Sequence, residues 1–155
     1  MDDKEPIGLL IGAVRRRIKQ AVGTHVRDFS LTTQQFWILV AVAEHPGCSL
    51  RELAEHLRMD EPTASRLIAT LMRRKLVQIK GDKDDRRRAR IHLRASGEAL
   101  AAKLSDVATS MRAAVTEGLT VEEQQVLRVA LRKIIANMDR VHASAIERRP
   151  SRKQK

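Results

Sequence analysis

The chain has 155 residues, 43% of them hydrophobic, which suffices for one domain with a buried core and helical additions. It carries 30 Lys and Arg against 19 Asp and Glu, a net charge of +11 that favours an anionic partner such as nucleic acid. Aromatic residues make up only 2%, which argues against recognition of RNA or single strands by base stacking. No apolar run is long enough for a transmembrane helix, so we expect no membrane association. The single cysteine and the absence of a signal-peptide pattern indicate a cytoplasmic protein.

Two helices are predicted before residue 47. The first is about twenty residues long and has an apolar seam with alternating spacings of four and three residues. The members of this seam are Ile7, Ile11, Val14, Ile18, Ala21 and His25. Thr32 with Gln35 forms a capping box that starts the second helix, which runs to about Glu44 and is almost entirely apolar. We therefore expect the second helix to be largely buried.

Residues 49–73 have the pattern of two helices joined by a tight turn. Ser49 with Glu52 forms another capping box, Asp60 is a good N-cap, and Pro62 falls in the first turn of the second helix. Five residues of that helix should face inward: Ala64, Leu67, Ile68, Leu71 and Met72. Small hydroxyl side chains and arginine remain for the other sides, where they suit contact with base edges and phosphates.

A basic hairpin follows directly. Val77 and Ile79 alternate with polar residues, and on the return strand Ala89, Ile91 and Leu93 should face inward while Arg88, Arg90 and His92 face outward. Residues 80–94 contain seven Lys and Arg against three Asp. A solvated charged loop is the plain alternative, but this cationic density beside a helix pair favours phosphate contact. The predicted fold is mainly α with a small β-hairpin wing, a winged helix-turn-helix.

Two long helices complete the fold. One runs from Ser96 to about Glu117 and ends at Gly118, and Thr120 with Glu123 caps the last. The last helix has a coiled-coil-like seam made of Leu127, Leu131, Ile134, Met138, Val141 and Ala145. Such a seam needs a partner helix. We therefore expect an N-terminal dimerisation helix (1–29), a DNA-binding lobe (30–94), C-terminal dimerisation helices (95–146) and a disordered basic tail (147–155).

The wing carries the most specific sequence signature. Asp85, Arg87, Ile91, Leu93 and Gly97 follow the D-x-R, aliphatic-x-Leu and helix-opening Gly pattern, and residues 73–77 read RRKLV. In these motifs, and in one helix before and two after them, the chain resembles the MarR family of transcriptional regulators. The resemblance implies a homodimer that binds a pseudo-palindromic operator in double-stranded DNA. It implies that Arg87 enters the minor groove and that Asp85 holds it in place.

Two positions depart from the family pattern. Lys75 stands where a helix-ending Gly is usual, so either the turn is not left-handed or it carries about 1 kcal/mol of strain. Arg94 replaces the usual Thr, so we expect Ser96 to cap the following helix instead. Both changes should slightly loosen the wing geometry.

The candidate DNA contacts lie on both motif helices and the wing. They are Ser49, Arg51, Thr63, Ser65, Arg66, Thr70, Arg86, Arg87, Arg88 and Arg90. The resemblance also implies an effector site for a small molecule, for which His25, Phe36 and Trp37 are candidates, although plain core roles would explain them equally. The effector itself is not identified by the sequence.

Other chemistry is weakly supported. Cys48 could sense oxidants, but a packing role before the helix cap is the simpler interpretation. Potential metal ligands gather between residues 44 and 56, namely Glu44, His45, Cys48, Glu52 and His56. They lack any recognised zinc spacing, so we expect no metal and no cofactor. Enzyme motifs are also absent from the sequence.

The leading hypothesis is a dimeric, sequence-specific regulator of the MarR type, with a ligand-responsive repressor favoured. Three alternatives stay open: a non-specific architectural DNA-binding protein, a cysteine redox-sensing regulator, and a protein-interaction module that no longer reads DNA.

Overall fold

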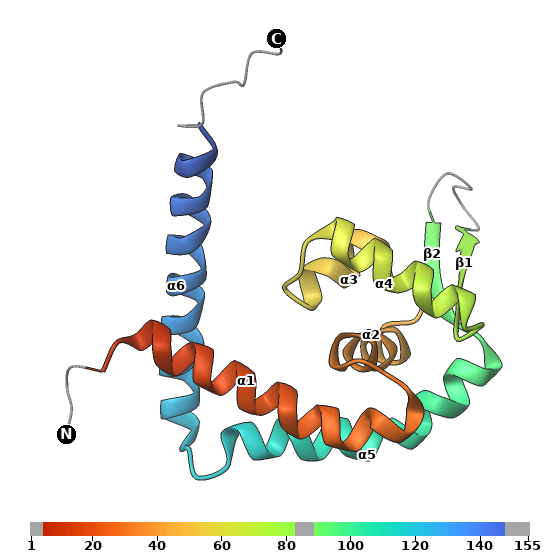
Figure 1. Cartoon of the computed structure of the whole chain (residues 1–155), viewed down its shortest axis with the longest axis horizontal. Helices are drawn as coiled ribbons and strands as arrows, with labels where there is room; N and C mark the ends of the chain where they lie inside the picture. Colours follow the sequence, from red (N-terminus) through yellow and green to blue (C-terminus); the bar gives the residue numbers. More distant parts are fainter. Residues whose placement is uncertain (1–4, 83–88, 148–155) are drawn as a thin grey trace. The chain divides into compact units, whose positions relative to one another are not determined.

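The computed structural model describes residues 5–82 and 89–147, and it is mainly helical with one antiparallel hairpin (Figure 1). The elements in chain order are α1 (Ile7–Val26), a 3-10 turn η1 (Arg27–Phe29), α2 (Thr33–Glu44), α3 (Leu50–His56), α4 (Glu61–Arg73), β1 (Val77–Gly81), β2 (Ala89–Leu93), α5 (Ala95–Thr116) and α6 (Val121–Glu147). This arrangement confirms the predicted winged helix-turn-helix. The chain forms two compact units that divide between Val115 and Thr116.

Three helices of the first unit, α2, α3 and α4, begin where the sequence predicted caps. Thr32 Oγ1 accepts a hydrogen bond from the Gln35 N–H, while the Gln35 side chain accepts one from the Thr32 N–H. Ser49 and Glu52 form the same reciprocal pair at α3, and Asp60 caps α4 by accepting from the Thr63 N–H at 2.8 Å. Each cap satisfies amide groups that a helix cannot pair internally, so these starts are fixed locally.

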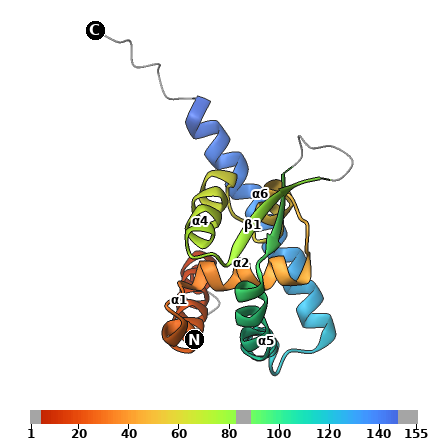
Figure 2. The ribbon, with the colours of Figure 1, turned by 90° about the vertical axis from the view of Figure 1, so that its right-hand side faces the viewer.

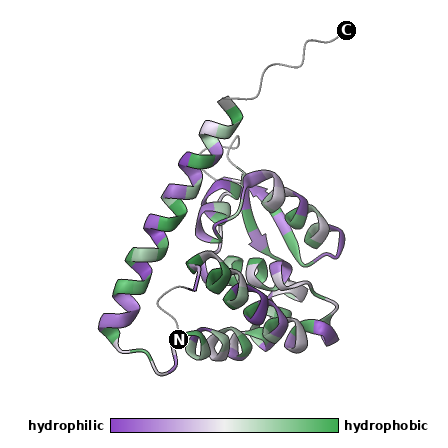
Figure 3. Ribbon diagram, turned by 60° about the vertical axis from the view of Figure 1, so that its left-hand side comes forward, coloured by the Kyte–Doolittle hydropathy of each residue, from purple (hydrophilic) through white to green (hydrophobic). Residues whose placement is uncertain are grey.

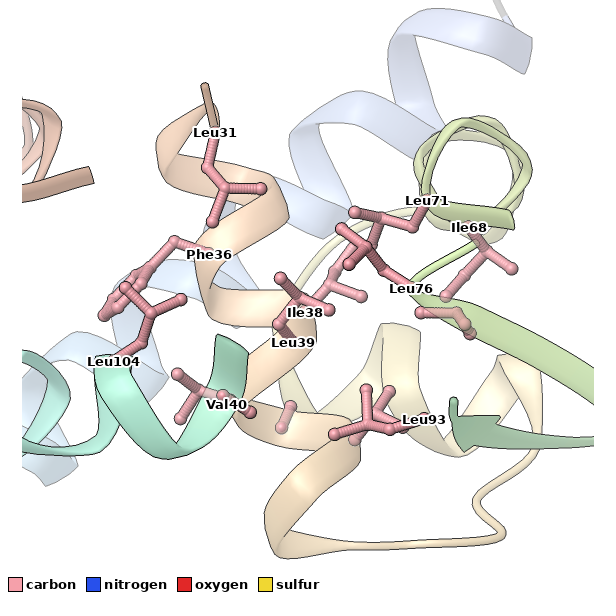
Figure 4. Packing of buried hydrophobic residues seen from close by; sticks show 14 of the residues in the cluster. Leu31, Phe36, Ile38, Leu39, Val40, Ile68, Leu71, Leu76, Leu93 and Leu104 are labelled. Atoms are coloured by element: carbon pink, nitrogen blue, oxygen red, sulfur yellow. The ribbon is translucent and has the colours of Figure 1, made fainter. Parts of the chain in front are cut away.

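The core of this unit is built around α2, which contacts α1, α3, α4 and β2. Seven of its twelve residues are buried: Gln35, Phe36, Ile38, Leu39, Val40, Ala41 and Val42. In the close view, Leu104 of α5 lies beside Phe36, and Leu71 and Ile68 of α4 pack with Leu76 (Figure 4). The largely buried helix expected from the sequence is confirmed.

Among residues 5–82 and 89–147, three non-glycine residues have a left-handed backbone, and each follows a helical segment. They are Ser30 (φ 52°), Arg58 (φ 53°) and Lys75 (φ 58°). Lys75 thus settles the alternative posed by the sequence: the turn is left-handed, and a lysine bears the strain that glycine would avoid. The predicted cap at Ser96 is wrong, because α5 already begins at Ala95 and the Ser96 hydroxyl donates to the Lys75 carbonyl at 2.7 Å.

Three predicted inward positions are also wrong. Met72 is 39% exposed and Ile79 of β1 is 46% exposed, and Ala89 on β2 is exposed as well. The hairpin residues that belong to the core are Val77, Ile91 and Leu93. The core therefore does not extend to the ends of the strands nearest the wing tip. The helical and strand periods place these residues on the correct face, but the outer part of that face extends past the core.

The second unit contains α6, which starts at the predicted capping box of Thr120 and Glu123. Apolar and polar residues alternate along it (Figure 3). Its seam is largely open to solvent, with Leu127 45%, Met138 56% and Val141 61% exposed. The basic tail predicted beyond α6 lies outside the described residues. Among the described helices, none is long and apolar enough to cross a membrane.

Candidate nucleic-acid interface

One side of α4 carries a continuous row of polar side chains. Arg66 donates to Thr63 Oγ1, Arg73 donates to Thr70 Oγ1, and the Thr70 hydroxyl donates to the Arg66 carbonyl, each at 3.0 Å. The spacing of three, four and three residues keeps these four on one helix face. The opposite face is buried through Ala64, Ile68 and Leu71. We call the row Thr63, Arg66, Thr70 and Arg73 the polar face of α4.

The N-terminus of α4 has its own charge. Hydrogen bonding from the Thr63 N–H lowers the pKa of the Asp60 carboxyl, which keeps this cap ionised. Ser65 is exposed but lies off the polar face, beside a shallow apolar hollow that Met72 and Ile79 also line. The sequence analysis placed Ser65 together with Thr63 and Arg66, but in the structure Ser65 lies on a different side of α4.

At the start of α3, Ser49 uses its hydroxyl as the helix cap, and it is half-buried. Arg51 is exposed and pairs with Glu55 one turn later at 2.9 Å, with side chains 77% and 64% exposed. An ion pair this open is weak and can exchange for a phosphate. Arg51 therefore offers a cation to a DNA phosphate, whereas Ser49 offers only its hydroxyl group.

The wing is anchored at its base by backbone atoms. Strands β1 and β2 pair antiparallel from Val77 with Leu93 to Gly81 with Ala89. The loop before α3 adds a short third segment, because the Gly47 N–H donates to the Ile91 carbonyl and the Ile91 N–H donates to the Cys48 carbonyl, both at 2.9 Å. Figure 2 shows the hairpin beside α4. The wing base and both motif helices therefore belong to one connected structure.

Arg90 does not have the outward position expected from the sequence. Its Nε donates to Asp82 Oδ2 at 2.7 Å, and its Nη1 lies 3.5 Å from Glu52 Oε2 and 3.4 Å from the Gly47 carbonyl oxygen. The Arg90 side chain is only 26% exposed, since it lies between the hairpin and the start of α3. The alternation rule failed because two carboxylates attract the guanidinium back over the strand.

The remaining wing candidates fall in residues 83–88. Asp85, Arg86, Arg87 and Arg88 lie outside the described residues, so their predicted DNA contacts stay predictions. Within the described residues a different carboxylate, Asp82, braces a different wing arginine, Arg90.

Comparisons with known proteins agree with this geometry. Residues 29–88 match the sequence model of the MarR family. Over 86% of the chain and 85% of the relative, the sequence is 29% identical to the HTH-type transcriptional repressor NicR of Pseudomonas putida. The structure of the S. aureus MepR–DNA complex superposes with a TM-score of 0.73 at 25% identity, covering 86% of this chain and 99% of that one.

Over residues 29–88 the chain is therefore similar to the MarR family, and these relatives and structures extend the similarity over most of the chain. A further MarR-family likeness is to Bordetella bronchiseptica BpsR, whose structure describes regulation of DNA binding by 6-hydroxynicotinic acid. That structure is 27% identical, has a TM-score of 0.70, and covers 86% of this chain and 96% of its own. The relatives are transcriptional regulators, as the sequence resemblance implied.

The three effector candidates lie in different surroundings. Phe36 is fully buried, and its ring meets Trp37 edge-on at a centroid distance of 4.7 Å. His25 is exposed and its Nδ1 lies 2.9 Å from the Ala21 carbonyl of its own helix. Phe36 therefore has a core role, and the effector site implied by the resemblance stays a prediction.

Two arginines on and after α4 were not among the sequence-predicted site residues. Arg73 completes the polar face of α4, and its position two turns after Arg66 was a usable signal. Arg74 donates from both terminal nitrogens to the carbonyls of Ser30 and Phe29, at 2.9 and 3.0 Å. Those partners lie 44 and 45 residues away, so no local pattern could have indicated them.

Cys48 has the packing role that the sequence favoured. It is half-buried, and burial raises the pKa of its thiol, with the Glu52 carboxylate adding to the effect. A thiol with a raised pKa has little reactive thiolate at neutral pH. This environment argues against an oxidant-sensing role.

Proposed function

We propose that the protein is a homodimeric, sequence-specific transcriptional regulator that binds a pseudo-palindromic operator in double-stranded DNA. The observation that carries the proposal is the polar face of α4, which projects from a helix held rigidly by its buried side and by the wing base. Its arginines and hydroxyls match the donors that read guanine and adenine edges in the major groove. The net charge of +11 supplies general attraction to DNA.

We assign the roles along this surface as follows. Arg66 and Arg73 read base edges or flanking phosphates, with Thr63 and Thr70 holding their guanidinium groups in place. Ser49 and Arg51 clamp phosphate at the start of α3. Arg86, Arg87 and Arg88 remain proposed minor-groove contacts of the wing. Arg90 braces the wing and is not assigned a DNA contact.

A homodimer is supported by the apolar seam of α6. In the second unit, Leu127, Leu131, Met138 and Val141 are between 37% and 61% exposed, more than a lone helix of a stable protein normally presents. A second copy of the chain would bury this seam. Two-fold symmetry then implies half-sites about ten base pairs apart.

We further propose that a small molecule releases the operator, by analogy with the regulation that the BpsR structure describes. The chain would then act as a ligand-responsive repressor, through binding alone and without catalysis. A role on chromosomal DNA places it in the cytoplasm.

The first test is selection of DNA sites by the purified protein at roughly physiological salt. We expect an enriched pseudo-palindrome bound at least about a thousand-fold more tightly than bulk DNA. Binding that tracks salt alone, with no enriched sequence, would replace this proposal with the architectural one.

Single variants then test the assigned surface. Arg66→Ala should weaken operator binding by about 1–3 kcal/mol and relax the preference at one base position. Arg132→Ala, an exposed arginine on α6, serves as the matched control and should leave affinity nearly unchanged. Equal losses from both variants would mean that α4 contributes only charge.

The dimer is tested separately. Leu131→Glu should shift the protein to a monomer in analytical ultracentrifugation, because a carboxylate cannot be buried unpaired in an apolar seam. A dimer that survives Leu131→Glu would move the interface away from α6.

A further inference from the structure

The corner between α2 and α3 contains a cluster that the function proposed above does not use. His45 is the C-cap of α2, Glu44 is its last residue, and His56 is the last residue of α3. One ligand atom from each of the three can be chosen so that all lie within 4.8 Å of one another. The two imidazole rings meet edge-on with centroids 4.8 Å apart.

The cluster borders an open cavity of about 460 Å³. His45 and His56 line it, together with Cys48, Glu52 and Arg90. All three cluster residues are exposed, so a solvated ion can reach their ligand atoms without any opening of the core. No zinc spacing is recognisable in the sequence because His45 ends α2 and His56 ends α3, and the two residues meet only through the fold.

We propose that Glu44, His45 and His56 form a binding site for a first-row divalent transition metal ion such as Zn²⁺. Two imidazoles and one carboxylate are the donors that such ions prefer, and three protein ligands leave one position open. Metal–ligand bonds of about 2.0–2.2 Å place tetrahedral donors about 3.4 Å apart. The exposed side chains need to close by roughly 1–1.5 Å, which rotamer changes can provide.

The electrostatics of the corner favour a cation. The last carbonyls of α2 and α3 direct the negative ends of both helices toward it. Each carboxylate oxygen has a second lone pair, so Glu44 can bind a metal while it still accepts from Arg112.

Two neighbouring groups are not assigned as ligands. The thiol of Cys48 is half-buried in the same cavity wall, and it is not among the ligand atoms that converge. Glu52 is engaged in capping Ser49 at 2.7 Å. The predicted donor set is therefore the three residues alone, which makes Cys48→Ser a sharp control.

The site would tie the end of α2 to the end of α3, which leads into the proposed reading helix α4. Glu52 and Arg90 in the same cavity connect it to the wing base. We expect metal binding to change operator affinity at least about threefold. This second expectation rests on the proposed function, whereas metal binding itself does not.

The full-length protein should first be titrated with Co²⁺, followed by visible absorption, and with Zn²⁺, followed by calorimetry. We expect one ion per chain and a tetrahedral Co²⁺ spectrum. His45→Gln, His56→Gln and Glu44→Gln should each weaken binding by at least about tenfold, at or beyond the effect of losing an outer-shell partner. Cys48→Ser and His25→Gln should bind as the wild type does.

Arg112→Met adds a test in the opposite direction. It removes the cation that competes for Glu44, so metal binding should become tighter if Glu44 is a ligand. Retained metal binding in the double variant His45→Gln, His56→Gln would overturn the site. Loss of binding in Cys48→Ser would overturn it as well. So would a wild-type affinity no higher than that expected of a single exposed histidine such as His25. Circular dichroism checks that each variant is folded.

Operator affinity is then measured with and without Zn²⁺, in the wild type and in His56→Gln. A metal effect confined to the wild type supports the coupling. Metal binding with unchanged operator affinity would overturn the coupling alone, and failure to bind DNA at all would reject the proposed function while leaving the metal titration valid.

Discussion

Arg112 of α5 donates hydrogen bonds from its two terminal nitrogens to the two carboxylate oxygens of Glu44, at 2.6 and 2.9 Å. Its guanidinium carbon also lies 5.7 Å from the centre of the Trp37 ring, so one side chain joins two positions of α2. The pair connects residues that are 68 apart in the sequence. It attaches α5 to the exposed end of a helix whose other residues are mostly buried.

This pair gives a stability prediction with a defined pH dependence. Both side chains are partly exposed, at 49% and 39%, so Arg112→Met should cost about 1 kcal/mol or less at neutral pH. The pKa of Glu44 is lower in the folded chain than its unfolded value of about 4.3. The stabilisation is therefore fully present above about pH 5 and is lost as the pH falls through the folded pKa. Urea unfolding of both proteins between pH 3 and 7 measures it, and a constant difference across that range would contradict the assignment.

Gly97 at the start of α5 lies directly against the backbone of Leu76. A Cβ added there would lie 2.0 Å from the Leu76 carbonyl oxygen, an atom that already accepts from the Arg94 N–H. Gly97→Ala should destabilise the fold by about 3 kcal/mol or more, since backbone must move. Gly23→Ala, in open space within α1, should be neutral or stabilise by up to about 1 kcal/mol. Thermal unfolding of the pair checks this, and similar melting temperatures would show that the α5 junction is looser than described.

The left-handed Lys75 predicts an unusual gain from glycine. Lys75→Gly removes the clash of a Cβ at φ 58° but adds chain entropy to the unfolded state, so the net gain should be about 0.5 kcal/mol. Lys75→Ala keeps the Cβ and should give no gain, which separates backbone strain from loss of the charge. Denaturant titration resolves the two variants if they are measured side by side. Equal stability of the alanine and glycine variants would argue against strain at this turn.

Arg90 and Asp82 distinguish a bracing role from a DNA contact. Arg90→Met should lower the unfolding temperature and weaken operator binding while leaving the salt dependence of binding unchanged, because no phosphate contact is lost. Asp82→Asn should also weaken binding, although it removes a negative charge from a DNA-facing hairpin. Fluorescence anisotropy at several salt concentrations gives both quantities. A drop of about one unit in the salt slope for Arg90→Met would restore the DNA contact that the sequence predicted.

The parts of this fold that the sequence predicted well are those decided by near neighbours. The boxes at Thr32, Ser49 and Thr120 and the cap at Asp60 each involve residues three apart, so their hydrogen bonds are readable from spacing alone. Gly118, which has a left-handed backbone just after α5, could likewise be predicted as a helix end from its own residue type.

The interactions that the sequence could not predict join distant segments. Arg74 with the Ser30 carbonyl and Arg112 with Glu44 depend on how whole helices pack. Arg90 was misplaced because strand alternation takes no account of an attraction to a nearby carboxylate such as that of Asp82. Met72 was misplaced because periodicity gives the direction of a side chain and says nothing of where the core ends.

The wing base is held by backbone hydrogen bonds from the Gly47 and Ile91 amides. This attachment affects which substitutions the hairpin can tolerate during evolution. Most side-chain substitutions along the hairpin leave those amide and carbonyl groups in place. Only a proline, which removes the amide donor, breaks the attachment directly. The wing can therefore vary its charge and DNA preference widely while its distance from the reading helix stays fixed, so new operators can be acquired without rebuilding the frame.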